Sequence, residues 1–185
     1  MKLILRNTHV AMVLLVCFFT AMDSHGAQKG ITIIEVTTTA DVVDGDVSSI
    51  AALQGTPGND GSISLREAIT ASNNTVGEET ITFSTLGEYL VETALPEMGL
   101  SSGGTTIDGG GRLILVNGTG DPAVDGFLIT TGSNTISGVT IRGFQAAIRL
   151  SGPDAIGNLI TGSILGNLDV KKDTKGAVNL FNQYG

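Results

Sequence analysis

The stretch that decides the fold is Asn134-Thr-Ile-Ser-Gly-Val-Thr-Ile-Arg-Gly143, which returns 24 residues later as Asn158-Leu-Ile-Thr-Gly-Ser-Ile-Leu-Gly-Asn167. Both copies follow the pattern Asn-x-Ile-[Ser/Thr]-Gly-x-x-[Ile/Leu]. A spacing in the low twenties is typical of one turn of a β-solenoid, in which short strands of successive coils stack on one another. The alternative is a β-sandwich in which the repeat is a coincidence.

The solenoid makes a definite prediction about neighbours. Side chains alternate between the two faces of a strand, so apolar residues at equivalent positions stack inside the coil while Ser, Thr, Asn and Arg point outward. The predicted pairs are Ile136 with Ile160, Ile141 with Leu165, and Asn134 with Asn158, the last as a hydrogen-bonded ladder at a turn.

Short β-type runs separated by Gly, Asn, Asp, Ser and Pro fill the chain from Thr80 onward, without a helical period of useful length. Upstream, Ile31–Thr39 is β-branched and predicts one further strand. The fold class we expect is therefore all-β: a short right-handed parallel β-helix with a small N-terminal capping helix. The expected division is a signal peptide over 1–26, a strand, loop and helix over 27–79, and β-helix coils over 80–185.

The capping helix is predicted over Ser64–Asn73. Ser64 followed by Glu67 is a capping-box pattern, and Leu65 and Ile69 lie on one apolar face. A helix of about two turns does not stand alone in water, so it must pack on something. We expect it to cover the open N-terminal end of the coils, with Ser64, Leu65, Glu67 and Ile69 as the structural cap. Arg66 is interpreted as part of a structural ion pair.

The segment Asp41–Asp60 is rich in turn residues and is predicted to be a loop. Its acidic residues offer oxygen ligands of the kind that Ca²⁺ prefers, although their spacing is not that of an EF-hand. The candidate ligands are Asp41, Asp44, Asp46 and Asp60, with Asn59 beside them. The alternative, which we favour, is ordinary turn chemistry for Asp and Asn. No other cofactor is expected.

Catalytic candidates are few. Asp108, Arg142 and Arg149 are the weak candidates, within a wider set that also contains Arg112, Asp121 and Asp125. An unperturbed Arg is a poor base, so a lyase built on these residues would need an assisting neighbourhood. Turn chemistry for Asp108 and solvated strand positions for the two arginines are the alternative that we favour.

The N-terminus has the features of an export signal. Lys2 and Arg6 precede an apolar run, Val10–Met22, which is shorter than the roughly 20 residues of a membrane-spanning helix. Small residues follow, so cleavage near Gly26 is expected and the protein is predicted to be secreted or on the cell surface. The alternatives are an uncleaved N-terminal anchor and a lipoprotein anchored through Cys17.

Cleavage would remove both histidines and the single cysteine, which all lie within residues 1–26. The mature chain could then use neither a Ser-His pair, a Cys nucleophile, a His-ligated zinc site nor a disulfide. It would keep 8 basic and 17 acidic residues, a net charge of −9. That sign disfavours a nucleic-acid partner.

Several stretches resemble the CSLREA domain family, which begins secreted or surface-exposed proteins of the pectin-lyase-like β-helix type. They are Val36–Asp41, Asp60–Ile69 with its Ser-Leu-Arg-Glu-Ala-Ile core, Glu79–Phe83 and Thr106–Gly111. The resemblance covers roughly Ile33–Leu168 and implies the fold and the export, but no defined activity. Ile63 stands where the family name has Cys, so any disulfide bond that this residue forms in other members is missing here.

The function we expect is that of an exported, non-catalytic β-helix module for surface display, adhesion or contact with matrix glycans. The alternatives are a polysaccharide lyase or hydrolase of the pectin-lyase-like type, and a truncated remnant of a larger surface protein. The chain ends at Val178–Gly185 without a predicted C-terminal cap. An uncovered strand edge invites pairing, so self-association through that edge is a further expectation.

Overall fold

The computed structural model describes residues 30–99, 103–117, 121, 123–166, 168–170 and 179–181. The predicted signal peptide over residues 1–26 lies outside these residues. Within them the chain is mainly β, with eleven strands and two short helices, so the expectation of a mainly β fold is confirmed. Neither of these two helices is long and apolar enough to cross a membrane.

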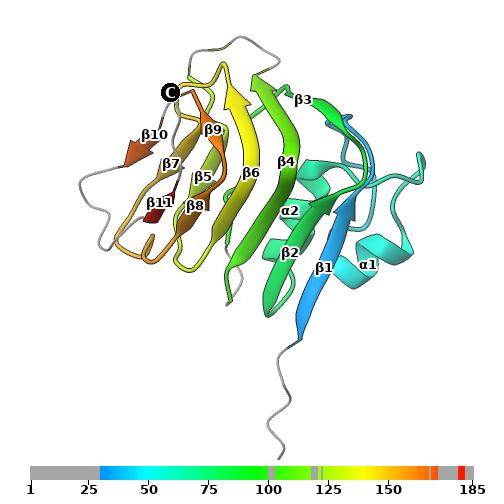
Figure 1. The fold of residues 1–185 in the computed structure, drawn as a ribbon. Helices are drawn as coiled ribbons and strands as arrows, with labels where there is room; N and C mark the ends of the chain where they lie inside the picture. The colour runs from blue at the N-terminus through cyan, green and yellow to red at the C-terminus, as the bar shows by residue number, and fades with distance from the viewer. Residues whose placement is uncertain are drawn as a thin grey trace, which may run out of the picture.

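The main sheet contains parallel strands only (Figure 1). Its continuous path runs through β1 (Ile31–Val36), β2 (Glu78–Phe83), β4 (Thr105–Asn117), β6 (Thr135–Arg142), β8 (Leu159–Thr161) and β11 (Asn179–Phe181). Beside this path, β3 (Gly87–Val91) pairs with β4, and β9 (Ile164–Leu165) pairs with β6.

A second, smaller sheet is also parallel and consists of β5 (Phe127–Ile129), β7 (Ile148–Leu150) and β10 (Leu168–Val170). Met98 adds an isolated parallel bridge to Ile129 at one edge of this sheet. From β4 to β11 the chain alternates between the two sheets: β5 follows β4, β7 follows β6, and β10 follows β8 and β9.

One apolar ladder crosses the main sheet at equal register. Its members are Ile34, Ile81, Ile107, Ile136 and Ile160. Each of them is at most 3% exposed. The stacking predicted from the repeat is confirmed for Ile136 on Ile160 and for Ile141 on Leu165. Equal register places every second side chain of each strand in the same core, which explains why the ladder is continuous.

The strand β4 differs from the sequence prediction. The turn residues of Ile107-Asp-Gly-Gly-Gly111 predict a break between two short runs, whereas the structure has one strand with a register irregularity between Asp108 and Leu113. Gly110 and Gly111 adopt φ values of 58° and 70°, which only glycine reaches at little cost. These residues therefore form a bulge within the strand instead of ending it.

The predicted loop over Asp41–Asp60 was wrong in part, because it contains α1 (Ile50–Gly55). The Ser49 side chain accepts a hydrogen bond from the Ala52 amide at 3.1 Å and begins this helix. Ile50 and Leu53 are fully buried in the common core. A helix of six residues is too short to show a period in the sequence, so its packing and its N-cap decide its structure.

The second helix, α2 (Leu65–Asn73), has the predicted position. Leu65, Ala68 and Ile69 are buried and belong to the same core cluster as the strand residues. α2 contacts β1, β2 and α1, and α1 also contacts β1. Both helices therefore pack at the β1 end of the main sheet (Figure 1).

Candidate functional site

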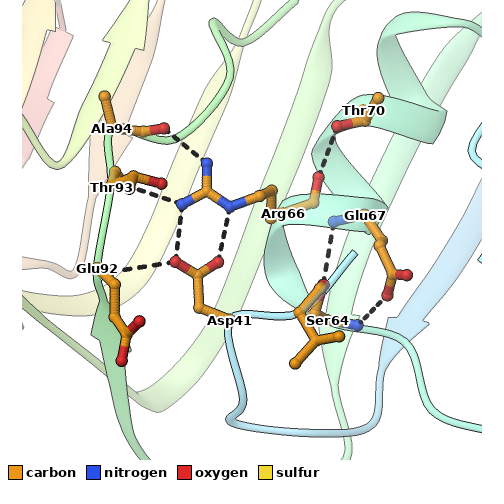
Figure 2. Close-up of polar contacts among 9 residues, drawn as sticks. Asp41, Ser64, Arg66, Glu67, Thr70, Glu92, Thr93 and Ala94 are labelled. Atoms are coloured by element: carbon orange, nitrogen blue, oxygen red, sulfur yellow. Dashed lines mark hydrogen bonds and ion pairs between the residues drawn. The ribbon is translucent and has the colours of Figure 1, made fainter. Parts of the chain in front are cut away.

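A polar network connects the start of α2 to two other segments (Figure 2). The Arg66 guanidinium forms a bidentate ion pair with Asp41, through Nε to Oδ1 at 2.8 Å and Nη2 to Oδ2 at 2.7 Å. It also donates to the carbonyl oxygens of Thr93 and Ala94 at 2.8 and 2.6 Å. The two charged side chains are only 15% and 10% exposed. Arg66 thus connects α2 to the segments of Asp41 and of Thr93 and Ala94, in the structural ion pair that the sequence predicts.

The capping box is present at Ser64 and Glu67. One Glu67 carboxylate oxygen accepts from the Ser64 amide at 2.9 Å, and the other accepts from the amides of Asp44 and Gly45, both at 2.9 Å. The Ser64 hydroxyl donates to the Val42 carbonyl at 2.5 Å. Glu67 is 1% exposed, so this carboxylate fixes the preceding loop as well as the helix start.

Asp41 and Asp44, two of the four candidate metal ligands, have protein partners. Asp41 is held by Arg66 and accepts a further bond from the Glu92 amide at 3.2 Å. Asp44 accepts from the Asn59 amide at 2.8 Å. Both carboxylates thus close loops within the protein.

Asp46 and Asp60, the other two, each accept a bond from the amide two residues ahead, Ser48 at 3.0 Å and Ser62 at 2.8 Å. Hydrogen bonds from the Ser48 side chain and amide lower the pKa of the Asp46 carboxyl from its ordinary value. Within the described residues, no three groups of His, Cys, Asp or Glu come together as a metal site would need. Asp46 and Asp60 thus make the contacts of ordinary turn chemistry.

The catalytic candidates are not brought together. Asp108 accepts from the Gly110 amide at 3.1 Å and is opposite Ser137 on β6. Arg142 lies five residues further along β6, roughly 16 Å away at about 3.3 Å per residue. It forms an ion pair with Glu88 in which both side chains are about half exposed, at 55% and 50%.

Arg149 lies on β7 in the second sheet, apart from the other two candidates. Its guanidinium forms a bidentate pair with Asp125, through Nε at 2.5 Å and Nη2 at 2.8 Å. It also donates to the Gln145 side-chain oxygen at 2.8 Å. Each of the two candidate arginines thus has its own carboxylate, which keeps its positive charge compensated within the protein.

A pocket of about 300 Å³ opens where the strands of the main sheet begin. Thr80, Thr106 and Thr135 line it and are paired in register on β2, β4 and β6. We call it the threonine pocket, and it also includes Ile31, Glu78, Glu79, Gly103, Gly104 and Ser133. Neighbouring strands are about 4.8 Å apart, so the three hydroxyl side chains span about 10 Å across the sheet.

Two glycines form one wall of the threonine pocket. A Cβ on Gly103 would lie 1.9 Å from the Gly77 carbonyl oxygen, and one on Gly104 would lie 2.2 Å from that of Ser133. Ser133 is the one non-glycine residue of the described chain with a positive φ, 64°. The strand starts are therefore held by close backbone contacts, in conformations that sequence periodicity does not reveal.

The threonine pocket was not predicted from the sequence, where the alternation indicates only that Ser, Thr and Asn side chains point outward. Thr80, Thr106 and Thr135 are separated by 26 and 29 residues, unlike the 24 of the visible repeat. The available signal was weaker: each of the three threonines comes one residue before an isoleucine of the apolar ladder.

Comparison with protein-family models, with curated proteins and with solved structures gives no match for this chain.

Proposed function

We propose that this chain is an exported, non-catalytic module, built as a short right-handed parallel β-helix, that contacts glycans of a cell surface or extracellular matrix. The hand is that of nearly all parallel crossover connections. The helices α1 and α2 would cover the β1 end of the coils. The resemblance to CSLREA domains and the apolar run behind Lys2 and Arg6 support the export.

The parallel pairing supports the β-helix part of this proposal. A chain that alternates between two parallel sheets, with equal register over Ile34, Ile81, Ile107, Ile136 and Ile160, has the arrangement that stacked coils require. The outer edge of β11, the last strand of the described path, would be the surface through which copies of the chain associate.

The observation that carries the glycan part is the row of Thr80, Thr106 and Thr135 in the threonine pocket. Hydroxyl groups both donate and accept hydrogen bonds, so they match the hydroxyls of a sugar. The volume of the threonine pocket is at the lower end of the range of small-molecule sites, about 300–1,000 Å³. A row that crosses strands suits a linear polymer better than a compact metabolite.

The ion pairs of Arg142 with Glu88 and of Arg149 with Asp125 support a non-catalytic role. In a lyase, the base must be free to reach its substrate, and each of these guanidinium groups is already engaged by a carboxylate of the protein. The competing function, cleavage of an anionic polysaccharide, would need one of these pairs to open.

The test is to incubate the secreted chain with insoluble and soluble polysaccharides, including polygalacturonate with Ca²⁺, and to measure both binding and released sugar. We expect binding to at least one polysaccharide without turnover. Product release that disappears in Arg142→Met or Arg149→Met would overturn the non-catalytic role. Retention of the chain inside the producing cell, measured by fractionation, would overturn the export.

A further inference from the structure

We propose that the threonine pocket binds a glycan chain that carries protonated amino groups, with the chain lying across β2, β4 and β6. This inference rests on the proposed function, since it names the class of glycan that the same surface would contact.

The shape of the pocket follows from two rows of outward positions. Thr80, Thr106 and Thr135 form one row. Glu78 and Gly104 belong to the other row: Glu78 lies two residues before Thr80 on β2, and Gly104 lies two residues before Thr106, just ahead of β4. The pocket lies beside Glu78, and part of its wall is the backbone of Gly103 and Gly104, which packs closely against Gly77 and Ser133. Each step between strands, about 4.8 Å, is comparable to the length of one pyranose ring in an extended glycan.

The charge of the pocket decides which glycan it accepts. Glu78 is exposed and directly beside Ile31, whereas Glu79 points inward and is only 1% exposed. None of the described residues that line the pocket is basic or aromatic. An anionic sugar would therefore meet a carboxylate without a compensating cation, and a neutral sugar would find no ring on which to stack.

A protonated amine would make the strongest contact that these residues offer. Hydrogen bonds with a charged partner are roughly twice as strong as those between neutral groups. The amine would donate to the Glu78 carboxylate, while the sugar hydroxyls would exchange hydrogen bonds with Thr80, Thr106 and Thr135. Because Glu78 is exposed, we expect a moderate preference of about fivefold for the amine over its acetylated form.

The test uses isothermal titration calorimetry with the whole chain. It compares oligomers of glucosamine, of N-acetylglucosamine and of galacturonic acid, all of the same length. A mildly acidic pH keeps the amines protonated. We expect the glucosamine oligomer to bind tightest and the galacturonic acid oligomer weakest. Added salt should weaken only the binding of the glucosamine oligomer, because screening acts on charge pairs.

Two variants locate the binding. Glu78→Gln should abolish the preference for the amine, and Glu35→Gln, which removes an exposed carboxylate from the same sheet outside the pocket, should leave it unchanged. Thr106→Val should weaken the binding of the glucosamine and N-acetylglucosamine oligomers alike, by about threefold, through loss of hydrogen bonds. The matched control is Thr140→Val, an outward position of β6 paired with Ile164 and outside the pocket.

The outcomes separate this inference from the function on which it rests. Binding of none of the three oligosaccharides would overturn this inference, and failure to bind any polysaccharide in the earlier test would contradict the proposed function as well. Binding of the galacturonic acid oligomer at least as tightly as the glucosamine oligomer, or a preference that persists in Glu78→Gln, would overturn the inference and leave glycan contact standing.

Discussion

The side-chain oxygen of Asn158 accepts a hydrogen bond at 2.8 Å from the backbone amide of Asn134, which lies 24 residues earlier in the chain. The side-chain oxygen of Asn134 in turn accepts a hydrogen bond at 2.8 Å from the backbone amide of Thr105, at the start of the neighbouring strand β4. Both asparagines are buried, at 0% and 1% exposure. This ladder joins three successive strand starts of the main sheet through side chains and supplements the backbone pairing.

Removal of the Asn158 side chain should therefore weaken the fold at a defined point. Asn158→Ala leaves the amide of Asn134 buried without this acceptor, which costs about 1–3 kcal/mol in the free energy of unfolding. Urea denaturation followed by circular dichroism measures the loss. Asn59→Ala, the same change at an exposed position, is the control and should have little effect. Equal stability of the two variants would show that the ladder does not stabilise the native state.

The network of Arg66 makes a second prediction. Arg66→Met leaves the largely buried Asp41 without its cation, so we expect a loss of about 3 kcal/mol in the free energy of unfolding. Arg142→Met removes the same groups from a half-exposed pair and should cost at most about 1 kcal/mol. Denaturant titration of both variants gives the comparison. A loss for Arg142→Met as large as that for Arg66→Met would contradict the structural role of Arg66.

Tyr89 gives the fold a dependence on alkaline pH. Tyr89 as a whole is 3% exposed, and burial raises the pKa of its hydroxyl above the ordinary value of about 10. The unfolded chain therefore releases this proton first as the pH rises, so the contribution of Tyr89 is complete below pH 10 and is lost above it. In a Tyr184→Phe background, absorbance of the tyrosinate ion should report a titration midpoint above that of free tyrosine. A midpoint at the ordinary value would contradict the buried position.

The apolar ladder predicts a strong contrast between two isoleucines of neighbouring strands. Ile136 on β6 is fully buried, and Ile164 on β9 is 56% exposed. Ile136→Ala should lower the free energy of unfolding by about 2–5 kcal/mol, because it leaves a cavity in the core. Ile164→Ala should change it by no more than about 0.5 kcal/mol. Thermal unfolding of the two variants tests the inward and outward assignment, and similar losses would contradict it.

The part of the fold that could be predicted from the sequence is the part governed by the alternation of inward and outward side chains and by the 24-residue repeat. Ile136 and Ile160, and the pair of Asn134 and Asn158, were expected to be neighbours because the repeat places them at equal positions of successive turns. The capping box at Ser64 was visible for a similar reason, since its two partners are three residues apart and its chemistry is local.

The features that the sequence did not reveal depend on contacts between distant segments. The short helix α1 depends on the burial of Ile50 and Leu53 in a core that residues from other segments complete. The bulge near Gly110 depends on the register of the strands on either side of β4. The threonine pocket depends on residues 26 and 29 apart, and these spacings differ from the 24 residues of the visible repeat, so the repeat does not point to it.

The most direct test of the stacked arrangement is a methyl–methyl NOE spectrum of the chain with labelled isoleucine δ1 methyl groups. The account predicts cross-peaks between successive ladder members, from Ile34 through Ile81, Ile107 and Ile136 to Ile160. Ile31 and Ile33, which are 62% and 58% exposed on β1, should give none to that series. A spectrum in which Ile136 contacts neither Ile107 nor Ile160 would contradict the parallel stack on which the pocket and the proposed function depend.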